Sequence, residues 1–448
     1  MFRKKSFLFL FILIWLCKPL MAQDEDALPS ADDELDTALK GSNSNEMRLM
    51  KNYQLGDGLN FVSKNAKLQF TQSIQVLYGI NTPSDLSSVG SDYRIRRARL
   101  NIAGLLFDDK IFFRLRLNLA GNYQSTTTGS RSFNNVVQDA LIEYRPSPGQ
   151  RINFGIRADY TDTREIRIEG ESLSFIERSI VSNAFDAIFD YGLRYAGQFR
   201  LGRGGMLKPY LSITTGDGTS ALQQNFEGFK YGVRLDYLPF GTFSKGGEFY
   251  MEDLARERTP KLVIGGVFSY NNGISSAKGT NGGRYIYGDS LQKIVRPSLV
   301  KYGADYLFKY RGFYSLGDFV LTRSGVPNNI AGEFSTSGNF MPYTNQTPEQ
   351  IKSTVLSRIN LGSGFNFQAG YLISKIAVGA RYSFLNQDEQ SAEFASINKA
   401  YALIGSYYFD GNNLKLNLET GYEQFNKATN TENYNGTLYL QIMLTVQF

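Results

Sequence analysis

The chain has 448 residues, with 48 Lys and Arg against 42 Asp and Glu, which gives a formal net charge of +6 at pH 7. It contains one Cys and no His, which excludes Ser-His-Asp and Cys-His catalysis and every histidine-based metal site. The near balance of charge gives no support for a nucleic-acid partner, and we expect neither a metal nor another cofactor.

The first 22 residues are typical of a cleaved signal peptide. A basic stretch, residues 1–5, precedes an apolar stretch, residues 6–16, and a cleavage site follows Ala22. A membrane anchor is disfavoured because the apolar run is about 11 residues long, against roughly 20 needed to span a bilayer. A lipoprotein attached through Cys17 is disfavoured because Leu16 stands where a small residue is expected. We expect export and loss of the only Cys.

Removal of this segment also takes four basic residues with it, so the mature chain has 44 basic and 42 acidic residues. Residues 23–66 are then the new N-terminus, acidic at first and polar thereafter. Such a stretch buries too little apolar surface to offset the entropy of ordering. We interpret it as a mobile periplasmic extension with room for one short helix, and a solvated tail without a function of its own is the simplest interpretation.

From residue 67 onward, polar and apolar side chains alternate. Arg114 and Arg116 alternate with Phe113, Leu115 and Leu117, whereas a helical period would scatter charge around the whole circumference. The Asp-rich residues 107–110 join this strand to the preceding one as an antiparallel hairpin. About sixteen such strands of roughly 10 to 14 residues occupy residues 67–448, and an even number suits a closed barrel. We therefore predict an all-β fold, a transmembrane antiparallel up-and-down β-barrel.

The connections support the same interpretation. When the strands are numbered in sequence order, most connections from an odd-numbered to an even-numbered strand are long. Most connections from an even-numbered to an odd-numbered strand are short, which is the pattern of long outer loops and short periplasmic turns. The connection 240–259 breaks this rule, being long on the periplasmic side. The 28 Tyr and 33 Phe fit lipid-facing positions and interfacial girdles. The alternating last strand, residues 438–448, ends in Phe448 and resembles the recognition signal of outer-membrane barrels.

Several segments in order and spacing resemble the phosphate-selective porin O and P family. They are residues 96–100 with Gly104 and Phe107, residues 139–140 with 143–144, residues 154–155, and above all residues 174–181. The resemblance covers about residues 58–448. It implies a sixteen-stranded homotrimeric porin whose third outer loop folds into the lumen, with an anion path lined by arginines and lysines. Residues 160–188 lie where that loop is expected.

Arginine suits phosphate because its guanidinium fork donates two hydrogen bonds to tetrahedral oxygens and stays charged. Weak sites in series allow passage as well as selection. The candidate anion-path residues are the cations at the alternating strand positions expected to face the lumen, together with one in the expected inserted loop: Arg97, Arg99, Arg114, Arg116, Arg151, Arg157, Arg178, Arg194, Lys230 and Arg234.

A structural alternative stands beside this hypothesis, because barrel walls commonly pair inward arginines with inward carboxylates. Asp139, Glu143, Asp159, Asp190 and Asp236 share the lumen side. Arginines paired with these carboxylates would support the wall and would leave little positive electrostatic potential in the lumen to attract anions.

Arg94 and Arg96 fall on the lipid-facing parity. We expect them at the outer rim, reaching toward lipid headgroups or lipopolysaccharide phosphates.

The leading hypothesis is a passive anion porin of a Gram-negative outer membrane, for phosphate or polyphosphate. Its expected partners are membrane lipid, lipopolysaccharide, small anions and two further copies of the chain. The alternative is a non-conducting structural or assembly barrel in a larger outer-membrane complex. A barrel enzyme is disfavoured because barrel phospholipases and proteases usually need an imidazole base, so we expect no enzymatic activity.

Overall fold

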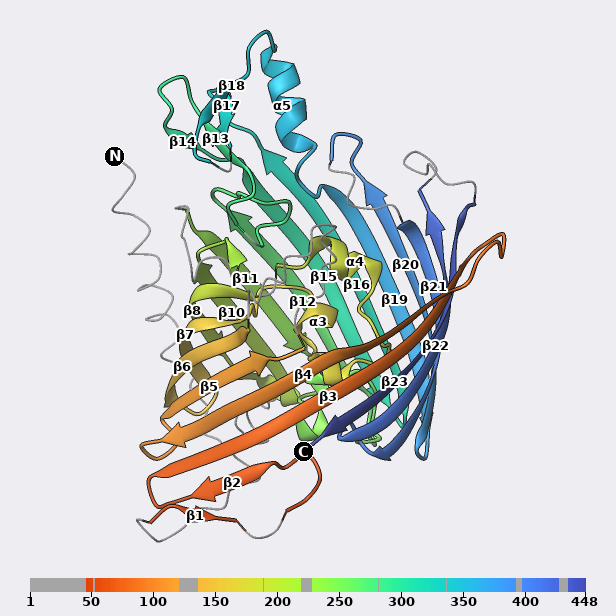
Figure 1. The fold of residues 1–448 in the computed structure, drawn as a ribbon. Helices are drawn as coiled ribbons and strands as arrows, with labels where there is room; N and C mark the ends of the chain where they lie inside the picture. Colours follow the sequence, from red (N-terminus) through yellow and green to blue (C-terminus); the bar gives the residue numbers. More distant parts are fainter. Residues whose placement is uncertain are drawn as a thin grey trace.

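The computed structural model describes residues 46–50, 53–120, 136–187, 189–218, 228–280, 282–335, 337–391, 397–426 and 434–448. Sixteen strands form a closed antiparallel barrel, which confirms the predicted fold class (Figure 1). The predicted signal peptide lies outside the described residues, as does most of the predicted N-terminal extension.

The barrel strands follow one another around the wall in chain order. They are β3 (Ala66–Pro83), β4 (Gly90–Leu106), β5 (Ile111–Asn118), β6 (Val137–Ser147), β7 (Gln150–Ala158), β8 (Phe189–Gly197), β10 (Gly205–Thr214), β11 (Lys230–Leu238), β12 (Lys261–Asn271), β15 (Ser298–Tyr310), β16 (Phe313–Gly325), β19 (Gly362–Ile373), β20 (Ile376–Gln387), β21 (Ile397–Asp410), β22 (Leu414–Phe425) and β23 (Gly436–Gln447). The short β9 (Phe199–Leu201) also pairs with β10.

The alternation predicted from the sequence sorts side chains between lipid and lumen. In β11, Val233 and Leu235 are 48% and 47% exposed on the outside, whereas Lys230 and Arg234 are buried on the inside. This follows from strand geometry, since successive side chains point to opposite faces. The outer face of the wall is accordingly apolar, and the ionised side chains of the wall gather in the lumen.

The last strand closes the barrel. β23 pairs with β3 in antiparallel register from Thr437 to Gln447, so neither strand keeps a free edge over this length. Phe448 continues the ladder by exchanging backbone hydrogen bonds with Gln72 at 2.9 and 2.6 Å. Beyond that point β2 (Leu59–Val62) pairs with the start of β3, and β1 (Arg48–Leu49) pairs with β2. The described part of residues 46–66 thus extends the sheet below the barrel.

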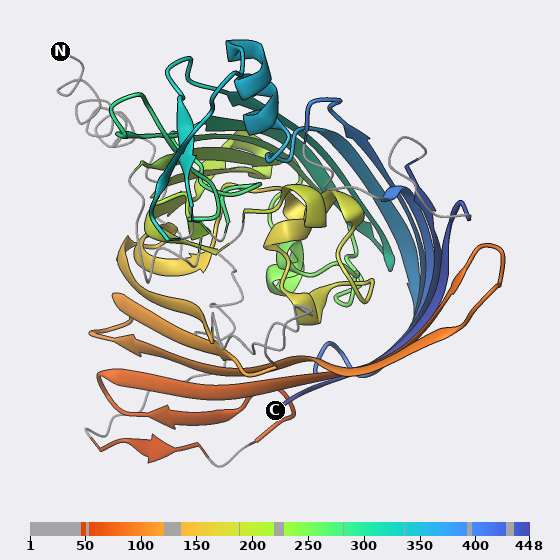
Figure 2. The same cartoon turned by 45° about the horizontal axis from the view of Figure 1, so that its top comes forward.

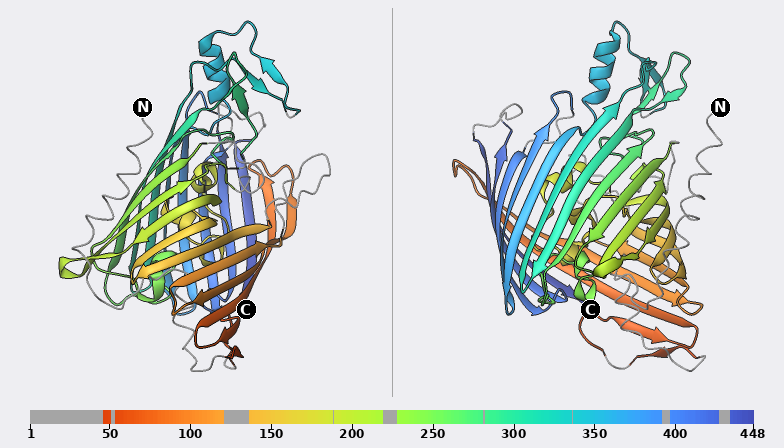
Figure 3. Two further views of the ribbon diagram at one scale, coloured as in Figure 1. Left: turned by 90° about the vertical axis from the view of Figure 1, so that its left-hand side faces the viewer. Right: turned by 180° about the vertical axis from the view of Figure 1, so that it is seen from behind.

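Short and long connections lie at opposite ends of the barrel (Figure 3). The hairpin predicted at residues 107–110 is confirmed: Phe107, Asp108 and Asp109 all adopt positive φ angles and join β4 to β5. Residues 311–312 and 374–375 make similar turns at the end that holds the C-terminus. We assign this end to the periplasm from the loop-length pattern.

Two connections fold into the lumen (Figure 2). The first, residues 159–187, joins β7 to β8, contains α3 (Arg164–Arg167), η2 (Gly170–Ser172) and α4 (Ile180–Phe185), and is called the outer insert here. The second, residues 239–260, joins β11 to β12, contains η5 (Ser244–Phe249), and is called the periplasmic insert. The unusual length of the 240–259 connection is thereby explained, because it enters the periplasmic mouth. The Met251 amide donates a 3.1 Å hydrogen bond to the Ser172 carbonyl, so the two inserts touch.

A small cap stands above the outer rim. It consists of β13 (Ile286–Gly288), β14 (Ile294–Val295), β17 (Gly332–Phe334), β18 (Phe340–Pro342) and α5 (Pro348–Leu356). Tyr287, Ile330 and Val355 lie in its buried apolar cluster. The cap therefore has a core of its own, separate from the ionised lumen.

Ile442→Arg is expected to lower the free energy of unfolding by about 2 to 4 kcal/mol, because it places a charge on the lipid face in the middle of β23. The measurement is the urea midpoint of the refolded barrel in lipid vesicles, followed by gel mobility of unboiled samples. Gln441→Arg, one residue away on the lumen face, is the control. Equal losses from both variants would contradict the assignment of the two faces.

Candidate functional site in the lumen

The outer insert brings an excess of carboxylates into the lumen. It contains seven Asp and Glu residues and three Arg. Ionised side chains with little water around them must be paired to be tolerated. The carboxylates of the insert therefore determine which arginines of the wall remain available for other anions.

The arginines of β4 and β5 face the outer insert. Arg99 donates to both carboxylate oxygens of Glu171 at 2.8 and 2.6 Å, and Arg116 donates to both oxygens of Glu169 at 2.9 and 3.1 Å. Arg114 lies 2.7 Å from the carboxylate of Asp139 on β6. Each of these predicted cations is inward-facing, and each has a carboxylate partner.

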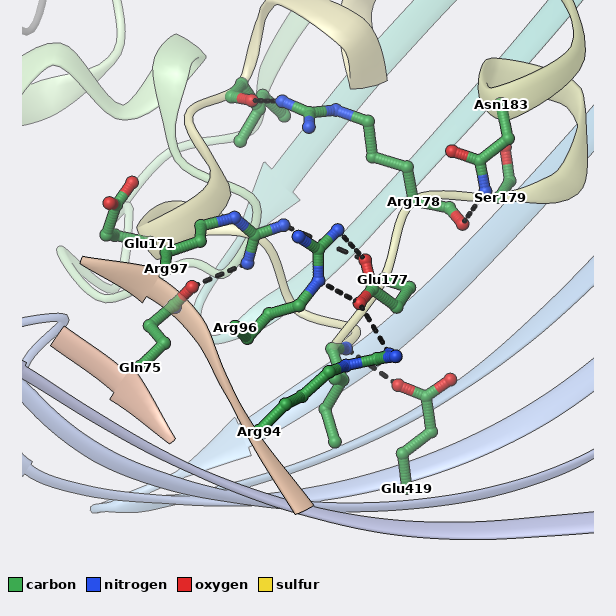
Figure 4. Close-up of polar contacts among 12 residues, drawn as sticks. Gln75, Arg94, Arg96, Arg97, Glu171, Glu177, Arg178, Ser179, Asn183 and Glu419 are labelled. Carbon is green, nitrogen blue, oxygen red and sulfur yellow. Dashed lines mark hydrogen bonds and ion pairs between the residues drawn. The ribbon is translucent and has the colours of Figure 1, made fainter. Parts of the chain in front are cut away.

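A β-bulge changes the arginine-rich start of β4. Gln75 of β3 pairs with Arg97, but the next residue, Val76, pairs with Ile95, so Arg96 is the extra residue on β4. A bulge re-aims the side chains of a strand. Here Arg96, like Arg97, reaches Glu177 of the outer insert (Figure 4).

The expectation that Arg94 and Arg96 reach outward to headgroups was therefore wrong, because strict alternation does not hold across the bulge. Arg96 contacts both oxygens of Glu177, the second at 2.7 Å. Arg94 lies 3.9 Å from the same carboxylate and 2.8 Å from Asp92. Together with Arg97, at 3.8 Å, three guanidinium groups surround Glu177, and we call these four residues the Glu177 cluster.

The Glu177 cluster is reachable from solvent. The side chains of Arg94 and Arg96 are 43% and 34% exposed, and that of Glu177 is 27% exposed. Burial alone would raise the pKa of the Glu177 carboxyl, but the hydrogen bond and charge of Arg96 and the charge of Arg97 outweigh it and hold this pKa below its ordinary value. The carboxylate is therefore ionised at neutral pH.

The opposite wall holds the beginning of the outer insert through buried ion pairs. Arg234 donates to both oxygens of Asp305 at 2.6 and 2.7 Å and lies 2.7 Å from Asp236. Asp236 also lies 2.8 Å from Arg164 of the insert. Lys230 donates to Asp159 at 2.8 Å. The paired-wall alternative describes this side of the lumen.

The remaining predicted cations also have partners. Arg194 donates to backbone carbonyls, one of them that of Asp190 at 2.5 Å, and lies 3.7 Å from Asp159. Arg151 and Arg157 each lie 3.9 Å from Glu143. Arg178 donates to carbonyls of the insert itself, one of them that of Ile168 at 2.6 Å. Most of these contacts lie within the wall or within the outer insert, and the contact between Arg194 and Asp159 joins the two.

The sequence prediction omitted five inward cations of the later strands: Lys208, Lys301, Lys309, Arg381 and Lys415. Lys301 pairs with Asp162 at 2.7 Å, and Arg381 donates to the Glu177 carbonyl at 2.6 Å. Lys208 pairs with Glu248 of the periplasmic insert at 2.6 Å. The alternation of polar and apolar residues would have identified these five cations as well, since each occupies one of the alternating positions of its strand that face the lumen.

A cavity of about 430 Å³ lies between the wall and the two inserts. Arg114, Arg116 and Lys309 line it from the wall, and Glu169 and Glu252 line it from the inserts. The Glu252 side chain is fully buried, and Lys309 donates to the Glu252 backbone carbonyl at 2.8 Å. Both anionic and cationic side chains thus line the cavity.

A closed barrel with an apolar outer face, an ionised lumen and a loop folded inside defines an outer-membrane porin-type barrel. Residues 68–269 match the model of the family described as phosphate-selective porin O and P, which confirms the resemblance noted in the sequence over this part of the chain.

Several solved structures are similar to the chain at low sequence identity. The OprB barrel of Pseudomonas putida, in a high-pH structure, is 9% identical with a TM-score of 0.50, over 85% of this chain and 94% of that chain. An OmpT variant of Vibrio cholerae lacking loop L8 is 9% identical with a TM-score of 0.49, over 86% and 100%. A mutant of the Rh. blastica porin is 12% identical with a TM-score of 0.42, over 85% and 100%. No curated protein matches the chain.

Arg234→Met is expected to lower the free energy of unfolding by about 3 to 5 kcal/mol, because it leaves two buried carboxylates, Asp236 and Asp305, short of a cation. The urea midpoint of the refolded barrel measures this. The control is Arg323→Met, whose exposed pair with Asp388 contributes less than about 1 kcal/mol. A loss no larger than that of the control would contradict the wall-structure role of Arg234.

Proposed function

We propose that this outer-membrane barrel is a passive porin for small anions such as phosphate or polyphosphate, with no enzymatic step. The observation that supports the proposal best is the convergence of Arg94, Arg96 and Arg97 on the single carboxylate of Glu177. Cations outnumber carboxylates there even when Asp92, the second partner of Arg94, is included. The family description points to the same solute class.

The chemistry of the cluster suits oxyanions. Guanidinium groups donate paired hydrogen bonds to phosphate oxygens and keep their charge at any working pH. Partial exposure of Arg94 and Arg96 lets a hydrated anion reach them without full desolvation. An anion that leaves this cluster would next meet Arg99, Arg116 and Arg114 along β4 and β5.

The ten candidate residues divide into two groups under this proposal. We assign Arg97, Arg99, Arg114 and Arg116 to the anion path, because they lie on the paired strands β4 and β5, within or beside the Glu177 cluster. We assign a supporting role to the other six, which lie on β7, β8 and β11 or within the outer insert: Arg151, Arg157, Arg178, Arg194, Lys230 and Arg234.

Single-channel recording of the refolded wild type in a planar bilayer under a KCl gradient tests the proposal. We expect a reversal potential that favours chloride and a current that phosphate blocks. Arg97→Glu or Arg116→Glu should lower the chloride-to-potassium permeability ratio about fivefold, the factor that roughly 1 kcal/mol gives. Arg323→Glu, in an exposed pair at the outer end of β16, is the control. An unchanged ratio in both lumen variants would rule out their place in the path.

A second candidate function, a non-conducting barrel within a larger complex, is favoured by the periplasmic insert. Lys309 donates to the carbonyls of Gly247 and Glu252 at 2.6 and 2.8 Å, which fixes this insert inside the mouth. Phe243 and Met251 of the insert join Ile168 of the outer insert in a buried apolar cluster. Apolar contact between two lumen segments narrows a water path.

Replacement of residues 239–262 by Asn-Gly, a two-residue turn that suits an antiparallel hairpin, separates the two candidates. The non-conducting candidate predicts no channels from the wild type and large open channels from this variant. The porin candidate predicts channels from both, with a larger conductance in the variant. Wild-type channels would exclude the non-conducting barrel.

A homotrimer, implied by the family resemblance, belongs to the porin proposal. The mass of the detergent-solubilised barrel, corrected for bound detergent, tests it.

A further inference from the structure

The Glu177 cluster has the geometry of an anion site that is already occupied by a carboxylate of the same chain. The Glu177 carboxylate accepts hydrogen bonds from two guanidinium nitrogens of Arg96, and guanidinium nitrogens of Arg94 and Arg97 lie within 3.9 Å of its oxygens (Figure 4). A free oxyanion bound to these arginines would take the same position. The carboxylate and the passing anion therefore exclude one another.

The backbone at Glu177 is held without its side chain. Arg381 donates to the Glu177 carbonyl at 2.6 Å, and the Ile176 amide donates to the carboxylate of Glu419 at 2.7 Å. Two residues on, the Ser179 hydroxyl donates to Glu165 at 2.5 Å. The Glu177 side chain is thus free to leave the arginines while the outer insert stays in place.

We propose that Glu177 is a tethered competitor that exchanges with passing multivalent oxyanions at Arg94, Arg96 and Arg97. Three guanidinium groups without a counter-charge would hold a phosphate too long for transport, since conduction needs sites that release their ion. An attached carboxylate weakens the binding of every anion at this cluster and returns when the anion leaves. The inference rests on the proposed function and makes Glu177 a residue that sets affinity and release rate.

Phosphate block of single channels measures this role in the full-length barrel. Glu177→Gln should lower the phosphate concentration for half block about fivefold, which is the factor expected for one partly exposed charge pair. The mean duration of each blocked event should lengthen, because release no longer has a competitor. Glu333→Gln is the matched control, since Glu333 also pairs with an arginine, Arg358, at similar exposure, but in the outer cap.

Glu177→Asp provides a second, independent variant. It keeps the charge but draws the carboxylate back by one methylene, so its half-block concentration should fall between those of the wild type and Glu177→Gln. A merely structural Glu177 would instead change the urea midpoint and leave the block unaltered.

The outcomes separate the inference from the function on which it rests. A wild type blocked by phosphate, with tighter and longer block in both Glu177 variants, supports the competitor. A wild type blocked by phosphate, with unaltered or weaker block in these variants, overturns the competitor and leaves the porin proposal standing. A wild type that phosphate does not block overturns both.

Discussion

The pairing of buried guanidinium groups with carboxylates is the constraint on which the rest of the lumen depends. An ionised group removed from water is costly unless a counter-charge and hydrogen bonds replace the lost solvation. The outer insert supplies carboxylates such as Glu171 and Asp162 to arginines and lysines of the wall strands, and the periplasmic insert supplies Glu248 to Lys208. The acidic loop and the basic wall therefore stabilise one another's positions.

Arginines outnumber carboxylates at the Glu177 cluster, and this local excess of positive charge follows from one extra residue in β4. The bulge at Arg96 lets neighbouring arginines, Arg96 and Arg97, approach one carboxylate. A regular strand would have pointed Arg96 at lipid, where a charge is unfavourable. The same irregularity thus removes a misplaced charge from the outer face and concentrates positive charge beside the outer insert, where the proposed anion path begins.

The two inserts set the width of the lumen together. One enters from each end, and they meet at the Met251 and Ser172 backbones within an apolar cluster that includes Leu173 and Tyr314. Ion pairs such as Lys208 with Glu248 fix the periplasmic insert to the wall beside that cluster. Under the proposed function, selectivity and openness are separate properties: the arginines around the outer insert would set the ion preference, and the contact between the inserts would set the width of the water path.

The sequence by itself determined the barrel, because period-two alternation and short turns such as residues 107–110 are local patterns that any outer-membrane strand must satisfy. It also placed Arg97, Arg114 and Arg234 in the lumen. Only the tertiary structure decided their partners, since Arg99 meets Glu171 and Arg234 meets Asp305 about 70 residues away along the chain. The alternation of side chains along the sequence also could not predict the bulge at Arg96 or the folding of residues 239–260 into the lumen. Both depend on strand register and on charges contributed by distant strands.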